Sequence, residues 1–128
     1  MTSPIESISA VTLATPDMAA AVGFYGALGF ECRYGGPNAP FTSYRVGAGF
    51  VNLQHDPDWP GVAVAAGADG RVWGRVILWV DDVDAIYDRA VAAGFSPLMA
   101  PSDAPWGERY FHLRDPSGHE LSFARPLA

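Results

Sequence analysis

The chain has 128 residues, of which 49% are hydrophobic and 17% charged, a composition typical of a globular protein that buries a core without disulfides. Its net charge is −6, and its eight basic residues are all arginines that stand singly, which argues against nucleic-acid binding because that function needs a clustered basic surface. A single cysteine, no apolar run long enough to span a membrane and a start without a signal-like pattern predict a cytoplasmic protein with no membrane partner.

The first half of the chain predicts a strand, a helix and three further strands. Val11 and Leu13 recur with the period of a half-buried strand. The helix that follows begins after Asp17, whose side chain suits the free amides of a helix start, and ends at Gly29, which suits a left-handed conformation. Its apolar face consists of Met18, Ala21, Val22, Tyr25 and Leu28. The three further strands are expected at residues 30–34, 41–46 and 50–55, with a tight turn at 47–49.

The second half repeats this order of elements. The stretch 76–95 matches the first strand and helix at one constant offset, with Asp81 and Asp82 where a cap is needed and Gly94 where the helix ends. The apolar face of this helix consists of Val83, Ile86, Tyr87, Ala90 and Val91. Further strands are expected at residues 96–100, 109–113 and 120–124. The proline- and glycine-rich stretch 56–71 is the expected linker, so the predicted modules cover residues 1–66 and 67–128.

These elements predict an α+β fold in which two tandem βαβββ modules form curved, mixed, largely antiparallel sheets around a cavity. Each module has one helix, so each sheet has one covered face. Strand alternation assigns to the covered face an aliphatic set: Val11, Leu13, Val51, Leu53, Val76, Leu78, Leu121 and Phe123. The opposite face receives a mixed set: Thr12, Asn52, Gln54, Trp73, Arg75, Trp79, Glu120 and Ser122. We expect this mixed face to line a ligand cavity.

Three stretches resemble the vicinal-oxygen-chelate superfamily, which includes glyoxalase I, extradiol dioxygenases, fosfomycin-resistance enzymes and bleomycin-resistance proteins. They read LATPDMAAAVGFYGALGF, GRVILWVDDVDAIYDRAVAAGF and PWGERYFHLRDPSGHELSFARP. The last stretch is the most specific, because it places an Asp-Pro-x-Gly turn between two strands. The resemblance covers nearly the whole chain and implies paired βαβββ modules.

The resemblance also implies four metal-ligand positions, since enzymes of the superfamily bind a divalent ion through one His, Gln or Glu on each of four strands. In this sequence the positions fall on Ala10, Asn52, Arg75 and Ser122. Ala10 has no donor atom, and Arg75 is a permanent cation that repels a metal. A shift of register could bring in Gln54 or Glu120 but leaves the other two positions unsuited. We therefore expect no metal and no cofactor. The resemblance points instead to the bleomycin-resistance-like branch, whose members sequester a drug as homodimers with cavities between halves of different subunits.

Arg75 is the sharpest candidate for ligand binding. It could pair with a carboxylate or phosphate of a ligand, or equally form a structural ion pair with Glu120. Trp106, on a loop, could stack on a planar ligand, and His112 could hydrogen-bond to it. The full set of candidate binding residues is Arg75, Trp106, His112, Asn52, Glu120, Ser122, Trp79 and Arg45. No residue is assigned a catalytic role or a metal.

Other polar residues receive structural interpretations. Cys32 is expected to be a buried thiol, and Trp59 to serve packing. His55 and His119 are expected at the surface or at an edge, and residues 115–118 to form a turn with no further role.

The sequence therefore predicts a non-catalytic protein that binds a small, antibiotic-like molecule, with that molecule and a second copy of the chain as its partners. The alternatives are a metal-independent enzyme using His112, Arg75 or Glu120, and an atypical metal-dependent lyase or dioxygenase. The charge of the ligand stays open, because the cavity arginines favour an anion whereas the net charge of −6 favours a cation.

Overall fold

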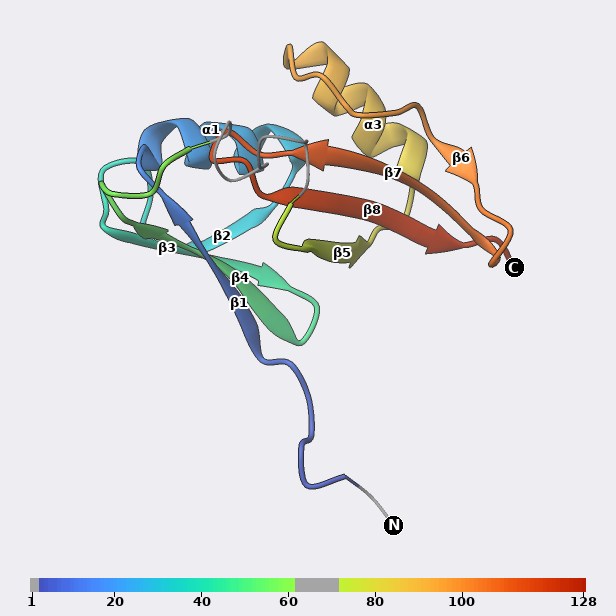
Figure 1. The fold of residues 1–128 in the computed structure, drawn as a ribbon, viewed down its shortest axis with the longest axis horizontal. Helices are drawn as coiled ribbons and strands as arrows, with labels where there is room; N and C mark the ends of the chain where they lie inside the picture. The colour runs from blue at the N-terminus through green and yellow to red at the C-terminus, as the bar shows by residue number, and fades with distance from the viewer. Residues whose placement is uncertain (1–2, 62–71) are drawn as a thin grey trace.

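The described part of the chain folds into two four-stranded sheets and two α-helices, in a computed structural model that describes residues 3–61 and 72–128 (Figure 1). This arrangement confirms the predicted α+β class and its tandem βαβββ modules. The predicted module boundary at residues 66 and 67, and most of the predicted linker, lie outside the described residues. Neither described helix is long and apolar enough to cross a membrane.

The first module forms a sheet in the order β1-β4-β3-β2. Strands β1 and β4 are parallel, and the other neighbouring pairs are antiparallel. The predicted turn after β3 is present, with Gly47 at φ 56°, a left-handed conformation that glycine adopts without strain. The elements are β1 (Ala10–Thr15), α1 (Met18–Leu28), β2 (Glu31–Tyr34), β3 (Phe41–Val46) and β4 (Gly49–His55).

The second module repeats this topology in the order β5-β8-β7-β6, again with one parallel pair, β5 with β8. Its elements are β5 (Arg75–Trp79), α3 (Val83–Ala92), β6 (Ser102–Asp103), β7 (Glu108–Arg114) and β8 (Glu120–Pro126). In Figure 1 both helices lie along the same side of the molecule, above the strands. The opposite faces of the sheets are therefore left without a helix.

The helix ends follow from the predicted capping residues. The Asp17 carboxylate accepts a hydrogen bond from the Ala20 amide, and Asp82 does the same for Ala85, so each cap satisfies an amide that has no partner inside the helix. Gly29 and Gly94 follow the two helices with φ of 99° and 88°. The predicted starts and ends of both helices are confirmed.

One predicted strand was wrong. Residues 96–100 do not form a strand, and the edge of the second sheet is the two-residue strand β6 instead. Pro97 cannot donate a backbone hydrogen bond, and Pro101 restricts the residue before it, so the segment cannot extend a ladder. The segment still makes a backbone hydrogen bond to β7, in which the Leu98 amide donates to the carbonyl of His112 at 2.9 Å.

The core lies between the helices and the covered faces of the sheets. Most side chains of the predicted aliphatic set are buried there, with Leu53 and Leu121 fully enclosed, and Val11 and Val76 are partly buried. Of the predicted apolar face of α1, Val22 is only partly buried, and Phe24, which was not predicted, is buried in addition to the others. Val91 of α3 is half exposed. Cys32 is also exposed, contrary to the prediction, because β2 is the outer strand of its sheet.

The two modules meet at the turn between β7 and β8, which was predicted to have no further role. Asp115 is buried, and its carboxylate accepts a 2.7 Å hydrogen bond from the hydroxyl of Tyr25 on α1. It also accepts hydrogen bonds from the backbone amides of Ser117 and His119 within its own turn. The Ser117 hydroxyl donates to Thr15 of β1 at 2.9 Å. Burial raises the pKa of the Asp115 carboxyl, and burial together with the nearby Asp115 raises the pKa of Tyr25 well above its ordinary value. The turn is therefore a buried junction between the modules.

His119 is buried in this junction, so its prediction as a surface residue was wrong. Its Nε2 lies 2.8 Å from the Ala14 carbonyl oxygen, and its Nδ1 accepts the indole N–H of Trp73 at 3.0 Å. The ring of Trp59 stacks on it with centroids 5.0 Å apart, and the Trp59 indole N–H donates to the Ser117 carbonyl. The packing role predicted for Trp59 is confirmed, because the ring covers a buried histidine.

Candidate functional site

The uncovered face of the second sheet carries ordered rows of side chains. Strand β8 lies between β5 and β7, so each of its residues has a neighbour on either side. Three successive rows face away from α3: Arg75, Glu120 and Arg114; Ile77, Ser122 and His112; and Trp79, Ala124 and Tyr110. Residues of the other parity, such as Phe111 and Phe123, are buried beneath the helix. Alternation along the strands thus produces one apolar face and one polar and aromatic face.

A small cavity of about 130 Å³ lies on this face. It adjoins a larger groove of about 630 Å³ between the edges of β1 and β5, since Arg75 and Ile77 line both hollows. Of the predicted binding residues, the cavity brings together Arg75, Trp106, His112 and Ser122. Its lining is completed by Ile77, Glu108, Tyr110 and Ala124.

Aromatic rings form one wall of the cavity. The Trp106 side chain is 66% exposed, and its ring lies 5.6 Å from that of Tyr110 at an interplanar angle of 36°. Tyr110 is in turn 5.1 Å from the ring of His112. An exposed indole beside further rings offers a planar ligand contact area that water otherwise covers.

The loop that carries Trp106 is held in place by hydrogen bonds. The Ala104 amide donates to the Glu108 carbonyl at 2.7 Å, and the Leu127 amide donates to the Gly107 carbonyl at 2.9 Å. Gly107 has φ 96°, a conformation that favours glycine, so the tight turn after Trp106 depends on this residue.

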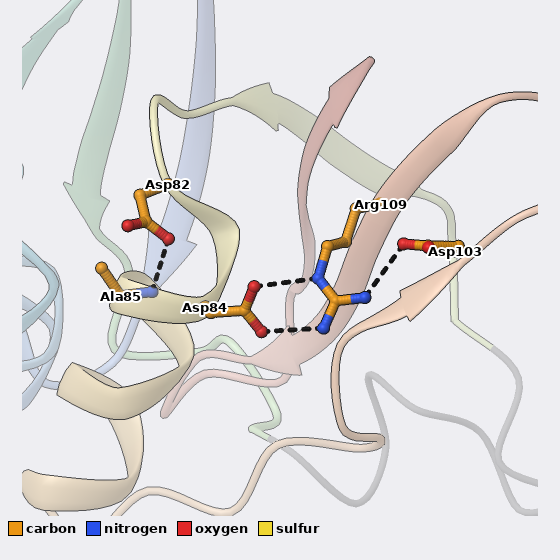
Figure 2. Close-up of polar contacts among 5 residues, drawn as sticks. All are labelled: Asp82, Asp84, Ala85, Asp103 and Arg109. Atoms are coloured by element: carbon orange, nitrogen blue, oxygen red, sulfur yellow. Dashed lines mark hydrogen bonds and ion pairs between the residues drawn. The ribbon is translucent and has the colours of Figure 1, made fainter. Parts of the chain in front are cut away.

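Arg109 braces the same hairpin from the opposite face (Figure 2). Its guanidinium makes two hydrogen bonds of 2.9 Å to the carboxylate of Asp84 on α3, and a third of 2.9 Å to Asp103 on β6. These bonds lower the pKa of Asp84 and raise that of Arg109. The arrangement connects the helix start, the edge strand and the strand that leads away from Trp106.

An ion pair between the partly exposed Arg75 and the buried carboxylate of Glu120 closes one end of the cavity. Arg75 contacts the Glu120 carboxylate through Nε at 2.8 Å and through Nη2 at 2.6 Å, and Arg114 approaches the other carboxylate oxygen at 3.6 Å. The Glu120 side chain is only 5% exposed, and the two arginines compensate the negative charge of its buried carboxylate. The ion pair anticipated for Arg75 is formed, while 44% of the Arg75 side chain remains exposed. Glu120 lies beneath the cavity and does not line it.

His112 lies between this charged end and the aromatic wall. Burial lowers the pKa of its imidazole, the positive charge of Arg75 lowers it further, and Glu120 acts in the opposite direction. Its Nδ1 is buried and has no hydrogen-bond partner among the described residues. Burial and Arg75 thus favour the neutral form of the imidazole, which can act as a polar but uncharged contact.

Three predicted binding residues lie elsewhere. Asn52 is on the first sheet, where its amide group bonds to the hydroxyls of Ser43 and Thr12. Trp79 and Arg45 line a separate hollow of about 300 Å³, and the Arg45 guanidinium lies 5.1 Å above the Phe50 ring. Strand alternation predicts which face of a sheet a residue occupies, but it does not predict how one sheet is placed relative to the other. The predicted set of binding residues therefore combines residues of both modules.

Sequence reasoning omitted Glu108 and Ile77 from the candidates. The signal was available, because Glu108 is two residues before Tyr110 and Ile77 is two residues after Arg75. Both residues share the face of their neighbours and line the cavity.

The four positions of the superfamily's metal ligands do not fit a metal. Ala10 has no donor atom, and the guanidinium of Arg75 is engaged with Glu120. Asn52 uses its amide group on two hydroxyls of its own sheet. The described residues contain no group of three or more His, Cys, Asp and Glu side chains that could hold an ion.

Several solved structures share this fold. TioX from Micromonospora sp. ML1 is 31% identical, with a TM-score of 0.73 over 95% of this chain and 100% of that one. A bleomycin-binding protein complexed with bleomycin is 21% identical, with a TM-score of 0.68 over 94% and 98%. Lactoylglutathione lyase from Agrobacterium tumefaciens is 21% identical, with a TM-score of 0.67 over 94% of each chain.

Among curated relatives, an uncharacterised protein of Mycobacterium bovis is 44% identical over 50 residues, which cover 39% of this chain. The match covers 33% of that protein, so the chain spans about a third of the length of the curated relatives it matches. The family model of the Glyoxalase/Bleomycin resistance protein/Dioxygenase superfamily matches residues 7–123. The chain therefore belongs to the Glyoxalase/Bleomycin resistance protein/Dioxygenase superfamily.

Proposed function

We propose that this protein binds a small aromatic, antibiotic-like molecule reversibly and without chemical change, in the cavity beside Trp106. The observation that carries the proposal is the exposed indole of Trp106, held over Tyr110 in a cavity whose other end is lined by the cationic side chain of Arg75. A planar ligand would cover apolar surface that is otherwise in water and would find a charged partner at one end. The adjoining groove of about 630 Å³ gives room for the rest of a larger molecule.

Two further considerations favour binding over chemistry. A bleomycin-binding protein has the same fold, and its structure is a complex with bleomycin. The positions where the superfamily's enzymes place metal ligands hold Ala10 and an ion-paired Arg75 in this chain. Reversible binding needs neither a metal nor a general base, and the residues present suffice for it.

The proposal includes a cytoplasmic homodimer. Ile77 and Trp79 on β5 are 61% and 69% exposed, on a strand at the edge of its sheet. An exposed apolar face of this kind favours a partner, and a second copy would cover it and deepen the ligand cavity.

A second candidate function is a metal-independent enzyme in which His112 accepts a proton from a small substrate. The observation in its favour is a neutral imidazole beside a cation, in a cavity that excludes part of the solvent. Turnover of a bound compound that is lost in His112→Ala alone would select this function over the first.

A ligand screen tests the main proposal. Planar antibiotics, bleomycin among them, are titrated while tryptophan fluorescence and thermal unfolding are followed. A true ligand should raise the melting temperature, and Trp106→Ala should weaken its binding about tenfold or more. The matched control is Tyr34→Ala, because Tyr34 is 67% exposed but lies on the outer strand of the other sheet. Unchanged affinity in folded Trp106→Ala, Arg75→Ala and His112→Ala would place the binding site elsewhere.

A further inference from the structure

The two ends of the cavity carry opposite charges. Strand β7 presents four residues on the uncovered face, in the order Glu108, Tyr110, His112 and Arg114. Along this face a carboxylate thus stands at one end, two rings in the middle and a guanidinium at the other end. Arg114 itself does not line the cavity, but Arg75, in the same row across the sheet, does. Same-face residues of a strand repeat about every 7 Å, so the cavity has a defined electrical direction along β7.

The cationic end of the cavity is formed by Arg75. Arg75 and Arg114 both lie against the buried carboxylate of Glu120. The contacts of Arg75 with Glu120 use its Nε and Nη2, and among the described residues its Nη1 has no further hydrogen bond. Since 44% of the side chain is exposed and it lines the cavity, Arg75 can donate to an anionic group there.

The anionic end has a carboxylate available to a ligand. Glu108 lines the cavity and is only partly exposed. Within residues 3–61 and 72–128 no hydrogen bond or ion pair engages its side chain. The nearest residue in sequence with a guanidinium, Arg109, points to the opposite face and is held there by Asp84 and Asp103. A half-buried carboxylate of this kind gains a charge-assisted hydrogen bond when an ammonium group enters.

We propose that the cavity selects zwitterionic aromatic molecules, whose anionic group pairs with Arg75 and whose ammonium group pairs with Glu108 while the ring packs on Tyr110 and Trp106. This inference rests on the proposed binding function of the same cavity. It also resolves the conflict between the cavity arginine, which favours an anion, and the net charge of −6, which favours a cation. Each half of a zwitterion finds its own partner, whereas a molecule with one charge leaves the opposite end of the cavity unused.

Four matched probes with one benzene ring test the charge preference: 4-(aminomethyl)benzoate, benzoate, benzylamine and benzyl alcohol. Their dissociation constants are measured at pH 7.5 by NMR titration, with the resonances of Tyr110 and His112 as reporters. The zwitterion should bind about tenfold more tightly than either singly charged probe, because each charge-assisted bond contributes to affinity. Benzyl alcohol should bind most weakly.

Two variants assign the charges. Glu108→Gln should reduce the affinity for the zwitterion to about that for benzoate, and it should not weaken the binding of benzoate, which has no ammonium group. The double variant Arg75→Gln with Glu120→Gln removes the direct anion contact without leaving a buried carboxylate unpaired, and should reduce the zwitterion to the affinity of benzylamine. Folding of both variants is checked by thermal unfolding.

The outcomes separate this inference from the proposed function. Equal affinities of all four probes, with shifts at Tyr110 and His112, would overturn the charge selection and leave aromatic binding intact. No shift with any probe, benzyl alcohol included, would remove the proposed binding site itself. An equal loss of benzoate and zwitterion affinity in Glu108→Gln would show that Glu108 acts on the fold of the cavity and not on the ammonium group.

Discussion

The hydroxyl group of Tyr25 donates a 2.7 Å hydrogen bond to the carboxylate of Asp115, although 90 residues of sequence separate them. Tyr25 lies in the helix of the first module and Asp115 in the turn between the last two strands of the second. Both side chains are buried, so this bond replaces contacts with water that the carboxylate gives up on folding. The bond therefore makes the packing of one module depend on the other.

Tyr25→Phe should destabilise the protein by about 1.5–3 kcal/mol, because the substitution leaves a buried carboxylate with one partner fewer. The measurement is urea unfolding at pH 7. Tyr44→Phe is the matched control: its hydroxyl is buried and has no hydrogen-bond partner among the described residues, so its loss should cost far less. Equal stability losses in the two variants would mean that the hydrogen bond to Asp115 contributes nothing of its own.

The lowered pKa of His112 predicts a contribution to the pH dependence of stability. The folded state binds fewer protons at this residue than the unfolded state between the lowered pKa and 6.5. Stability from this source is therefore complete above pH 6.5 and falls as the pH drops towards the folded pKa. Comparing wild type with His112→Gln isolates the effect from Asp115, whose raised pKa acts with the opposite sign. The stability of the wild type relative to His112→Gln should decrease as the pH falls through this window.

NMR titration of the same imidazole tests the physical cause. The pKa of His112 should lie below 6.5 in the folded protein, and Glu120→Gln should lower it further, because the carboxylate is the group that raises it. A rise of the pKa in Glu120→Gln would contradict this account of the charges around the cavity.

The guanidinium of Arg109 should restrain the hairpin that carries Trp106 (Figure 2). Arg109→Gln removes its contacts with Asp84 and Asp103, and the amides of Ala104 and Gly107 should then exchange with deuterium several-fold faster. Arg33→Gln is the control, because Arg33 makes an exposed ion pair on the first sheet. Similar exchange in both variants would show that the backbone bonds hold the hairpin without Arg109.

Sedimentation equilibrium at micromolar concentration tests the proposed homodimer. The chain has a mass of 13.6 kDa, and the measured mass should be twice this value. Ile77→Asp should shift the protein towards the monomer, because it places a charge on the exposed apolar face of β5. Ile5→Asp is the control, since Ile5 is 79% exposed near the N-terminus and lines neither of the two hollows that Ile77 lines. A wild-type monomer at this concentration would rule out the dimer and the cavity shared between subunits.

The fold could be predicted because its elements depend on neighbours in sequence. Alternation placed Val11 and Leu13 on the covered face, and the side chain of Asp17 capped its helix as its chemistry requires. The cavity was partly predictable for the same reason, since Arg75 and His112 share a face by parity. The segment 96–100, in contrast, has the strand-like pattern but contains Pro97, which cannot donate to a ladder, so the strand predicted there does not form.

The junction between the modules could not be predicted in this way. His119 shares the parity of Leu121 and Phe123 but stands directly after a turn, where a surface position was expected. It is buried because Trp59 and Trp73 come to it from distant parts of the chain. The parity that assigned Asn52 to the cavity was correct within its own sheet, but no local pattern states how two sheets are placed. Packing between the modules depends on pairs such as Tyr25 and Asp115, which lie far apart in the sequence and which no local pattern connects.

The rings stacked on His119 have a consequence for how the chain can be divided. Trp59 belongs to the first module and His119 to the second, and with the bond between Tyr25 and Asp115 they form a complementary surface on each half. Fragments ending at residue 61 and beginning at residue 72 would carry both sides of this surface. These side-chain contacts should therefore allow the two fragments to associate as separate molecules. Fusing them to the two halves of a reporter enzyme would detect this association.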